Sequence, residues 1–174
     1  MAGQLRAPNK DDDITLSWVE GDAARAEVGA WIGARIALDG AYISHGEVQA
    51  GLSRDGRTWI EGLAQVISGH AVADSETAIA CARAQDETLL AAAIVRFSLA
   101  GPAPFAVTED LVVEPGLRNT GIGGALMTFI ETEAHRRGAA WAFLESGLRN
   151  ERAHDFFQER GYEPISKVFA KRLD

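Results

Sequence analysis

Hydrophobic and polar residues alternate in the segment ITLSWV at residues 14–19, which predicts a half-buried strand. In residues 22–40 the apolar positions recur at three- and four-residue spacings, which predicts a helix; they are Val28, Trp31, Ile32 and Ile36. Residues 41–59 are rich in turn-forming residues, and residues 60–67 present a second helical face before Gly69. The first third of the chain therefore predicts one strand followed by two helices.

The pattern changes near residue 77 to long apolar runs. TAIACARA at residues 77–84 and TLLAAAIVRFSL at residues 88–99 are separated by a polar break, which predicts a β-hairpin, although the many alanines leave a helix as the alternative. The remaining segments predict, in turn, a strand, a helix, a strand, a helix and a final strand, at residues 104–113, 122–138, 140–146, 150–160 and 162–173. This order predicts an α/β fold in which helices flank one mixed sheet.

Composition narrows the class of protein. The chain has 174 residues, of which 47% are hydrophobic, and its 17 Lys and Arg against 25 Asp and Glu give a net charge of −8. We expect a flexible, polar N-terminal arm at residues 1–13 and a single domain at residues 14–174. An acidic chain is a poor candidate for binding nucleic acid, because such proteins concentrate Lys and Arg on one face.

The location and the metal content can also be predicted. The N-terminus lacks the features of a signal peptide, and no stretch approaches the length of about 20 apolar residues that spans a membrane. The lone Cys81 cannot form an internal disulfide and is expected in the core. The four histidines show no metal-ligand spacing. We therefore expect a cytoplasmic protein with no membrane role and no metal.

A glycine-rich segment, RNTGIGG at residues 118–124, lies between a predicted strand and a predicted helix. The free N–H groups of a helix N-terminus attract anions, and glycines let a phosphate approach the backbone. The segment lacks the Lys-Ser/Thr pair of a P-loop, and Leu126 stands where a dinucleotide-binding fingerprint needs Gly or Ala. A helix cap without a ligand is the alternative interpretation.

The pattern Arg-x-x-Gly-x-Gly after a strand ending Val-x-Pro resembles the acetyl-CoA-binding motif of the GNAT family of N-acetyltransferases. A second segment, NERAHDFFQERGY at residues 150–162, is similar to another signature of that family. The resemblance implies a mostly antiparallel sheet of six to seven strands with a central pair of splayed parallel strands. It also implies that acetyl-CoA is the cofactor and lies between those two strands.

The family pattern assigns cofactor-binding positions on three segments. They are the strand residues Leu111, Val112 and Val113; the loop residues Arg118, Asn119, Thr120, Gly121, Ile122, Gly123 and Gly124; and the helix residues Asn150, Ala153 and Phe156. Asn150 is also a plausible helix N-cap on its own.

The resemblance implies acetyl transfer to a primary amine, for which a base must take the ammonium proton. Glu109 and Asp110 match the family's acidic position, with Glu145 as a third candidate. On a regular strand Glu109 and Asp110 point to opposite faces, so at most one of them faces the acceptor, and we favour Glu109. Phe157 stands where the family has the tyrosine that protonates the thiolate. Tyr162, Tyr42 and water are the candidate substitutes, and the lack of an acid slows transfer without preventing it.

These observations predict an N-acetyltransferase that acts on a primary amine of a small molecule, by direct attack in a ternary complex. The negative net charge favours a cationic acceptor. The alternatives are a protein or peptide N-acetyltransferase and a CoA-binding module with little turnover, the second favoured by Phe157. The chain could also form a homodimer.

Overall fold

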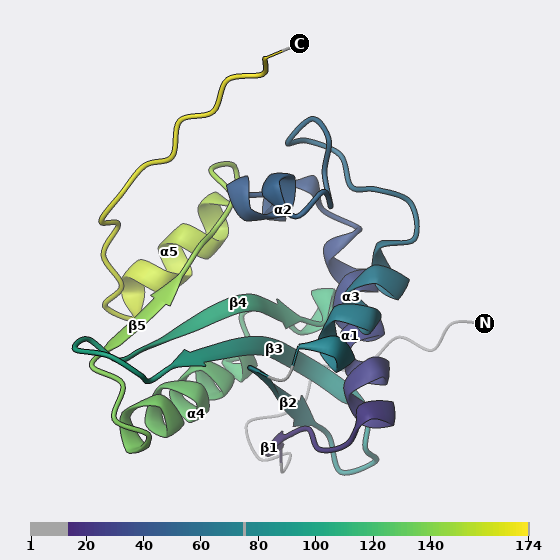
Figure 1. Ribbon diagram of the computed structural model, residues 1–174. Coiled ribbons are helices and arrows are strands. Elements are labelled where there is room, and N and C mark those ends of the chain that lie inside the picture. The colour runs from purple at the N-terminus through teal and green to yellow at the C-terminus, as the bar shows by residue number, and fades with distance from the viewer. Residues whose placement is uncertain (1–13, 75, 174) are drawn as a thin grey trace.

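Five strands form one open sheet in the order β1-β2-β3-β4-β5 in the computed structural model, which describes residues 14–74 and 76–173 (Figure 1). The strands are β1 (Thr15–Trp18), β2 (Thr77–Arg83), β3 (Leu89–Ser98), β4 (Phe105–Val113) and β5 (Trp141–Leu144). Neighbouring strands are antiparallel except for β4 and β5, which are parallel. The mixed sheet and the hairpin predicted between residues 77 and 99 are confirmed.

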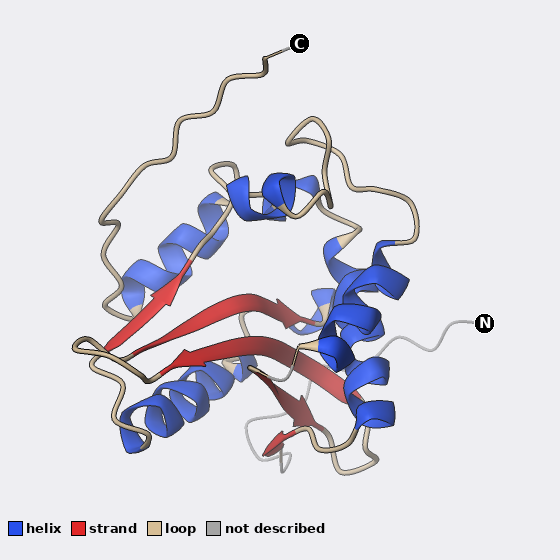
Figure 2. Ribbon diagram, in the orientation of Figure 1, coloured by secondary structure: helices blue, strands red, loops and turns tan. Residues whose placement is uncertain are grey.

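Helices cover both faces of the sheet (Figure 2). Helices α1 (Asp22–Ile36) and α3 (Leu63–Ala73) pack together on one face, and α4 (Ile122–Arg136) lies on the other. Helix α5 (Glu151–Glu159) runs beside β5, and three short helical segments complete the chain: η1 (Gly40–Tyr42), α2 (His45–Gln49) and η2 (Pro115–Leu117).

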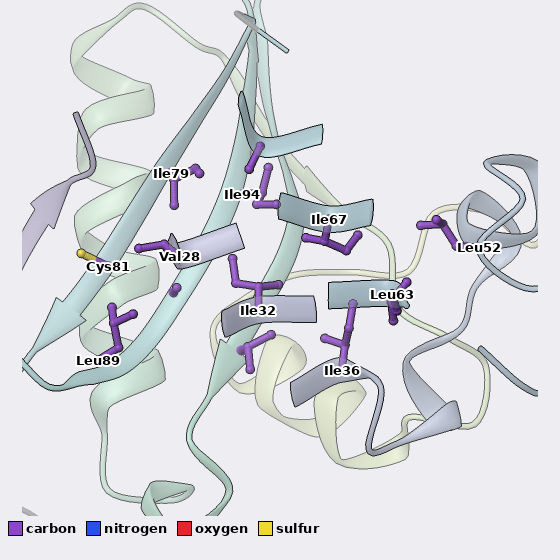
Figure 3. Close-up of a cluster of buried hydrophobic side chains, with 13 residues drawn as sticks. Val28, Ile32, Ile36, Leu52, Leu63, Ile67, Ile79, Cys81, Leu89 and Ile94 are labelled. Carbon is purple, nitrogen blue, oxygen red and sulfur yellow. The ribbon is translucent and has the colours of Figure 1, made fainter. Parts of the chain in front are cut away.

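The two faces have separate apolar cores. In the first, Ile32 and Ile36 of α1 meet Leu63 and Ile67 of α3 above the sheet residue Ile94 (Figure 3). In the second core, α4 buries the apolar face formed by Ile122, Leu126, Met127 and Ile130 against β2, β3 and β4. Burial of these side chains, each worth about 1.5–3 kcal/mol, holds the helices on the sheet.

A β-bulge interrupts the pairing of β3 with β4. Ile94 pairs with Asp110, but the next residue, Val95, pairs with Thr108, so Glu109 is the extra residue. Side chains normally alternate between faces along a strand, and a bulge changes that alternation. Ala106 belongs to the core under α4, whereas Val112, six residues later, belongs to the core under α1 and α3.

The parallel strands β4 and β5 diverge at the bulge in β4. They pair only from Phe105 opposite Trp141 to Thr108 opposite Leu144, and the rest of β4 has no partner on β5. The bulge and the end of this pairing coincide. The sheet therefore opens into a cleft between the second half of β4 and the residues that follow β5. This is the splayed pair of parallel strands that the family resemblance predicts.

Three predictions of local structure are wrong. The predicted C-terminal strand at 162–173 is absent, so the sheet has five strands among the described residues rather than six to seven. The apolar residues of that segment do not recur at every second position, so no face could be buried; Ile165, Val168, Phe169 and Leu173 are exposed.

The second helix does not stop before Gly69 but continues to Ala73, because Ile67 and Ala71 both belong to the core shared with α1. The short helix α2 lies in the segment predicted to consist of turns. The predicted arm at residues 1–13 lies outside the described residues. Among the described residues, no helix is long and apolar enough to span a membrane.

Candidate active site

A cavity of about 440 Å³, which we call the first cavity, fills the cleft between the diverging strands. Its walls come from the second half of β4, the residues after β5, the loop before α4, and one side of α5. Tyr42, Glu47 and Trp59, from the segment between α1 and α3, close it at another side.

The first turn of α4 faces this cavity. Gly121 is the N-cap with a φ of 91°, and the first intrahelical bond runs from Ala125 N–H to the Gly121 carbonyl, at 2.9 Å. The N–H groups before Ala125 therefore have no partner inside the helix, and the helix dipole adds positive potential. No acidic side chain occupies this first turn. The arrangement suits a phosphate.

Gly123 allows the close approach of three elements at this point. A Cβ there would lie 3.1 Å from Cγ2 of Val113 and 3.7 Å from the Phe156 ring. The missing side chain therefore leaves room where α4, β4 and α5 meet. Together with the free N–H groups, this gap forms a cradle that a larger residue would fill.

Most of the residues predicted to bind the cofactor line the first cavity. The ten that do are Leu111, Val113, Arg118, Asn119, Gly121, Gly123, Gly124, Asn150, Ala153 and Phe156. The other three do not line it: Val112 and Ile122 are buried in the two cores, and the Thr120 hydroxyl donates to the Leu117 carbonyl.

Two polar side chains of the first cavity lack bonds that the protein could have supplied. Ser146 Oγ is buried and has no hydrogen-bond partner among the described residues. Asn150 is 8% exposed and occupies the N-cap position of α5, yet its side chain makes no capping bond. Buried polar groups are normally bonded, so both groups are available to a ligand.

A second cavity, of about 760 Å³, lies between α2, α3 and the strands β3 and β4. The two cavities meet at the bulge, because both are lined by the same five residues: Glu47, Thr108, Glu109, Asp110 and Glu145. The two cavities therefore adjoin at this junction.

Glu109 and Asp110 both border these cavities, so the prediction that they point to opposite faces is wrong. The bulge makes β4 irregular here and turns both carboxylates toward the second cavity. Glu109 accepts a hydrogen bond from Arg96 Nε at 2.8 Å, and Arg96 also bonds Asp74 and Glu76. Glu109 is thus part of an ion-pair network.

The Asp110 carboxylate has no hydrogen bond or ion pair among the described residues. Desolvation raises the pKa of this carboxyl to about 7, and the nearby charges of Glu47 and Glu109 raise it further in the same direction. Burial and like charges both disfavour the ionised form. A carboxyl with a pKa near the working pH is suited to accept and release a proton.

The tyrosines occupy different places. Tyr162 lies outside both cavities, and its hydroxyl donates to Glu131 on α4 at 3.1 Å. Tyr42 lines the first cavity, where burial raises its pKa while the cations of Arg118 and Arg152 oppose that shift. Phe157 also lines the first cavity and carries no hydroxyl there. Tyr42 is therefore the tyrosine that borders the cleft.

The loop after β5 is held against the segment between α1 and α3 by several contacts. His45, at the start of α2, uses its backbone N–H and its ring Nδ1 to contact Oε1 of Glu145, at 3.1 and 2.5 Å. Gly147 packs so closely on this segment that a Cβ would lie 2.3 Å from the Ala41 carbonyl oxygen. Arg149 donates to the Gly40 and Gly56 carbonyls.

Sequence reasoning missed Glu47, which borders both cavities. The motif Ser44-x-x-Glu47 could have located it, because this spacing marks a capping box at a helix start. The structure contains that box: Oε2 of Glu47 accepts from both the backbone N–H and the hydroxyl of Ser44. Arg152 and Trp59 were also missed as lining residues, and no motif marks either.

The sequence of residues 20–162 matches the Acetyltransferase (GNAT) family, and this range covers β2 to β5, the glycine loop and α5. This chain belongs to the GNAT family of acetyltransferases. Members of the family use acetyl-CoA, which makes acetyl-CoA the cofactor of this fold.

A curated relative of this GNAT chain is an N-acetyltransferase. An aminoalkylphosphonate N-acetyltransferase of Salmonella typhimurium is 34% identical over 65 residues, which are 37% of this chain and 42% of that protein. The aligned region thus spans less than half of the curated relative.

Solved structures share the fold of this GNAT chain. The aminoglycoside N-acetyltransferase AAC(6')-Iy in complex with CoA has a TM-score of 0.63 at 15% identity, covering 94% of this chain and 96% of that one. The aminoglycoside 6'-N-acetyltransferase AAC(6')-Ih of Acinetobacter baumannii has a TM-score of 0.62 at 14% identity, covering 93% and 99%. At these identities the likeness establishes the fold.

The residues of the first cavity fit acetyl-CoA. The cradle at Gly123 and the N-terminus of α4 suit the pyrophosphate, and Arg118 lines the same cavity, with its cation close to Tyr42. The unbonded Ser146 hydroxyl and the Asn150 amide also line this cavity, where polar groups of a pantetheine arm could meet them.

Proposed function

We propose that this chain transfers the acetyl group of acetyl-CoA directly to a primary amine of a small molecule held in the second cavity. One observation carries the proposal: the two cavities share Thr108, Glu109 and Asp110, and Asp110 offers an unbonded carboxylate at that junction. When bound, acetyl-CoA supplies an acetyl thioester, which an amine can attack.

Asp110 is the general base in this proposal. An alkylammonium of pKa about 10.4 must lose a proton before it attacks, which costs about 4.6 kcal/mol at pH 7. A carboxylate with a pKa of about 7 is available at that pH and can accept the proton directly or through one water. Glu109, which the sequence favours for this role, is instead held by Arg96 and acts on Asp110 through its charge.

The strand β4 also supplies main-chain groups for the reaction. Leu111 lines the first cavity just past the bulge, where β4 no longer pairs with β5. Its side of the strand therefore has backbone groups free to bind the pantetheine arm. An N–H there can stabilise negative charge that develops on the thioester oxygen, as an oxyanion hole does.

The decisive experiment is a pair of measurements on the full chain. Calorimetric titration with acetyl-CoA, with ATP and NAD as controls at equal ionic strength, tests the first cavity. Release of CoA thiol with a set of small primary amines, with mass analysis of the products, tests the transfer. Binding of acetyl-CoA with no product from any amine would favour a CoA-binding module, while acetylation only of peptides would favour a protein acetyltransferase.

The CoA-binding module is the second candidate, and Phe157 favours it. The position borders the first cavity but cannot donate a proton to the departing thiolate. A thiol of pKa about 8.5 is only about 2 kcal/mol from ionisation at pH 7, so the lack of an acid slows transfer without preventing it.

A further inference from the structure

The second cavity is strongly acidic. Six carboxyl side chains line it, together with one arginine and one histidine. The arginine, Arg96, is already surrounded by carboxylates: its Nε, Nη1 and Nη2 donate to Glu109, Glu76 and Asp74. Its charge is therefore balanced within the wall, and the remaining negative charge faces the cavity.

The glutamates at the junction share one arrangement. Glu47 is bonded through Oε2 to Ser44, Glu145 through Oε1 to His45, and Glu109 through Oε1 to Arg96. In each of them the second oxygen accepts no bond from the residues that the structure describes. A carboxylate held through one oxygen keeps its orientation, so the other oxygen is preorganised for a donor from outside the protein.

Thr108 gives an independent indication that a ligand belongs here. It is 6% exposed and lines both cavities, yet its hydroxyl has no hydrogen-bond partner among the described residues. Its hydroxyl oxygen is not buried as an atom, so it stays open to a ligand in the cavities. The unpartnered Thr108 hydroxyl therefore marks the junction as a binding position for a polar group.

We infer that the acceptor is a small polycation, with at least one ammonium group in addition to the amine that is acetylated. This inference depends on the proposed function. The acetylated amine lies at Thr108 and Asp110, and the second ammonium bonds the free oxygens of Glu47 and Glu145. Linear polyamines and amino sugars with several amines share this chemistry.

The charges also exclude an acceptor of the opposite kind. An amine that carries a phosphonate would bring its anion among carboxylates, with Arg96 already engaged by three of them. The like charges of Glu47, Glu109 and Asp110 interact closely enough to raise the pKa of Asp110. A second ammonium relieves this repulsion, whereas an anion adds to it.

Kinetics with matched amines test the inference. The rate of CoA release is measured at saturating acetyl-CoA and fixed pH with n-butylamine, 1,4-diaminobutane, 3-aminopropylphosphonate and the amino sugar kanamycin. We expect kcat/KM for the diamine to exceed that for n-butylamine by about tenfold or more, mainly through KM, because a charge-assisted hydrogen bond to the second ammonium strengthens binding. The phosphonate should be the poorest substrate. The preference for the diamine over n-butylamine should decrease with added salt. The relative rates with 1,4-diaminobutane and kanamycin distinguish a linear polyamine from an amino sugar.

Two substitutions locate the second ammonium. Glu145→Gln and Glu47→Gln both retain an oxygen that can accept from His45 or Ser44, so the local structure is kept. In each variant the loss of kcat/KM with the diamine should exceed the loss with n-butylamine by about tenfold. Glu27→Gln is the matched control, since Glu27 lies on the exposed side of α1 and outside both cavities. This variant should leave kcat/KM unchanged for both amines.

Binding gives a readout that does not need turnover. Calorimetry on the CoA-loaded protein should show tighter binding of 1,4-diaminobutane than of n-butylamine. Equal kcat/KM or equal affinity for the two amines, or a preference for the phosphonate, overturns the inference and leaves the proposed acetyl transfer intact. Failure of acetyl-CoA to bind overturns the proposed function itself.

Discussion

Arg96 Nε lies 2.8 Å from Oε1 of Glu109 and donates a hydrogen bond to it. Arg96 lies on β3 opposite Val107, and Glu109 is the extra residue of the bulge in β4. Because the Glu109 carboxylate is engaged, the adjacent Asp110 is the carboxyl at the junction without a partner among the described residues. The ion pair thus distinguishes two neighbouring acids, because it holds Glu109 and leaves the Asp110 carboxylate open to a ligand.

Substitution of Asp110, the proposed base, should remove most of the activity. We expect Asp110→Asn to lower kcat by about 10²- to 10⁴-fold, because a general base typically contributes that much. Glu109→Gln, the matched neutral variant next to it, should have an effect below about tenfold. The measurement is CoA release with a good amine acceptor. A larger loss in Glu109→Gln than in Asp110→Asn would reverse the assignment.

The rate should depend on pH in one direction. Asp110 must be ionised to accept a proton, and its pKa is raised to about 7, so the rate should rise with pH through about 7 and then level off. Glu109→Gln removes one of the charges that raise this pKa and should move the midpoint to lower pH. A profile without an inflection between pH 6 and pH 8 would contradict the assignment.

Asp110 should also reduce the stability of the folded protein. Its pKa is higher in the folded than in the unfolded chain, so its ionisation opposes folding increasingly as the pH rises from about 4 to about 7. Asp110→Asn should therefore raise Tm by several degrees at pH 8 and by less at pH 5, since about 1 kcal/mol corresponds to about 2–4 °C in a chain of this size. Thermal unfolding monitored by circular dichroism at both pH values checks this.

The cation beside the glycine loop should be needed for the cofactor. We expect Arg118→Ala to weaken acetyl-CoA binding by about tenfold or more, because a charge-assisted bond contributes about 1.5–3 kcal/mol. Arg83→Ala is the matched control, since Arg83 lies at the β2–β3 hairpin and bonds the Glu87 carbonyl outside both cavities. Calorimetric titration measures both, and equal affinities would place the pyrophosphate elsewhere.

A hydroxyl added at Phe157 should accelerate the reaction. We expect Phe157→Tyr to raise kcat by at most about 30-fold, because the thiolate lies only about 2 kcal/mol above the thiol at pH 7. Tyr162→Phe, which removes a hydroxyl bonded to Glu131 outside the cavities, should leave kcat unchanged. No gain in Phe157→Tyr would indicate that water or Tyr42 already protonates the thiolate.

The exposed C-terminal segment should add little to stability. Ile165, Val168, Phe169 and Leu173 contribute to neither core, so a chain ending at Glu163 should have a Tm within about 2 °C of the full chain. Removal of these apolar side chains should also increase solubility. A drop of more than about 5 °C in Tm would show that the segment packs on the domain.

The sequence was sufficient to predict the elements whose apolar pattern matches what they bury. Helix α4 presents Ile122, Leu126 and Ile130 on one face, and these residues form the second core. The glycine loop was predictable for a different reason: glycine has no Cβ, so few other residue types are suitable where a backbone must approach a ligand closely. The C-terminal segment misled because its apolar content suggested a strand that its spacing does not support.

The junction of the two cavities was harder to predict because it depends on the bulge in β4. A bulge leaves no signature in the alternation of residues 104–113, so Glu109 and Asp110 were expected on opposite faces. The contact of Glu109 with Arg96 joins residues from different strands, and single-sequence patterns do not report such pairs. Glu47 reaches the junction from a five-residue helix too short to show a periodic face.

The extra residue in β4 also determines which sequence changes the strand can tolerate. Before the bulge, Ala106 faces α4; after it, Val112 faces α1 and α3, although the two are an even number of residues apart. Deletion of Glu109 would restore a regular strand and exchange the faces of everything that follows, which would carry Leu111 and Val113 away from the first cavity. A substitution at this strand alters one side chain, whereas a change in its length by one residue rearranges both cores and the cleft together.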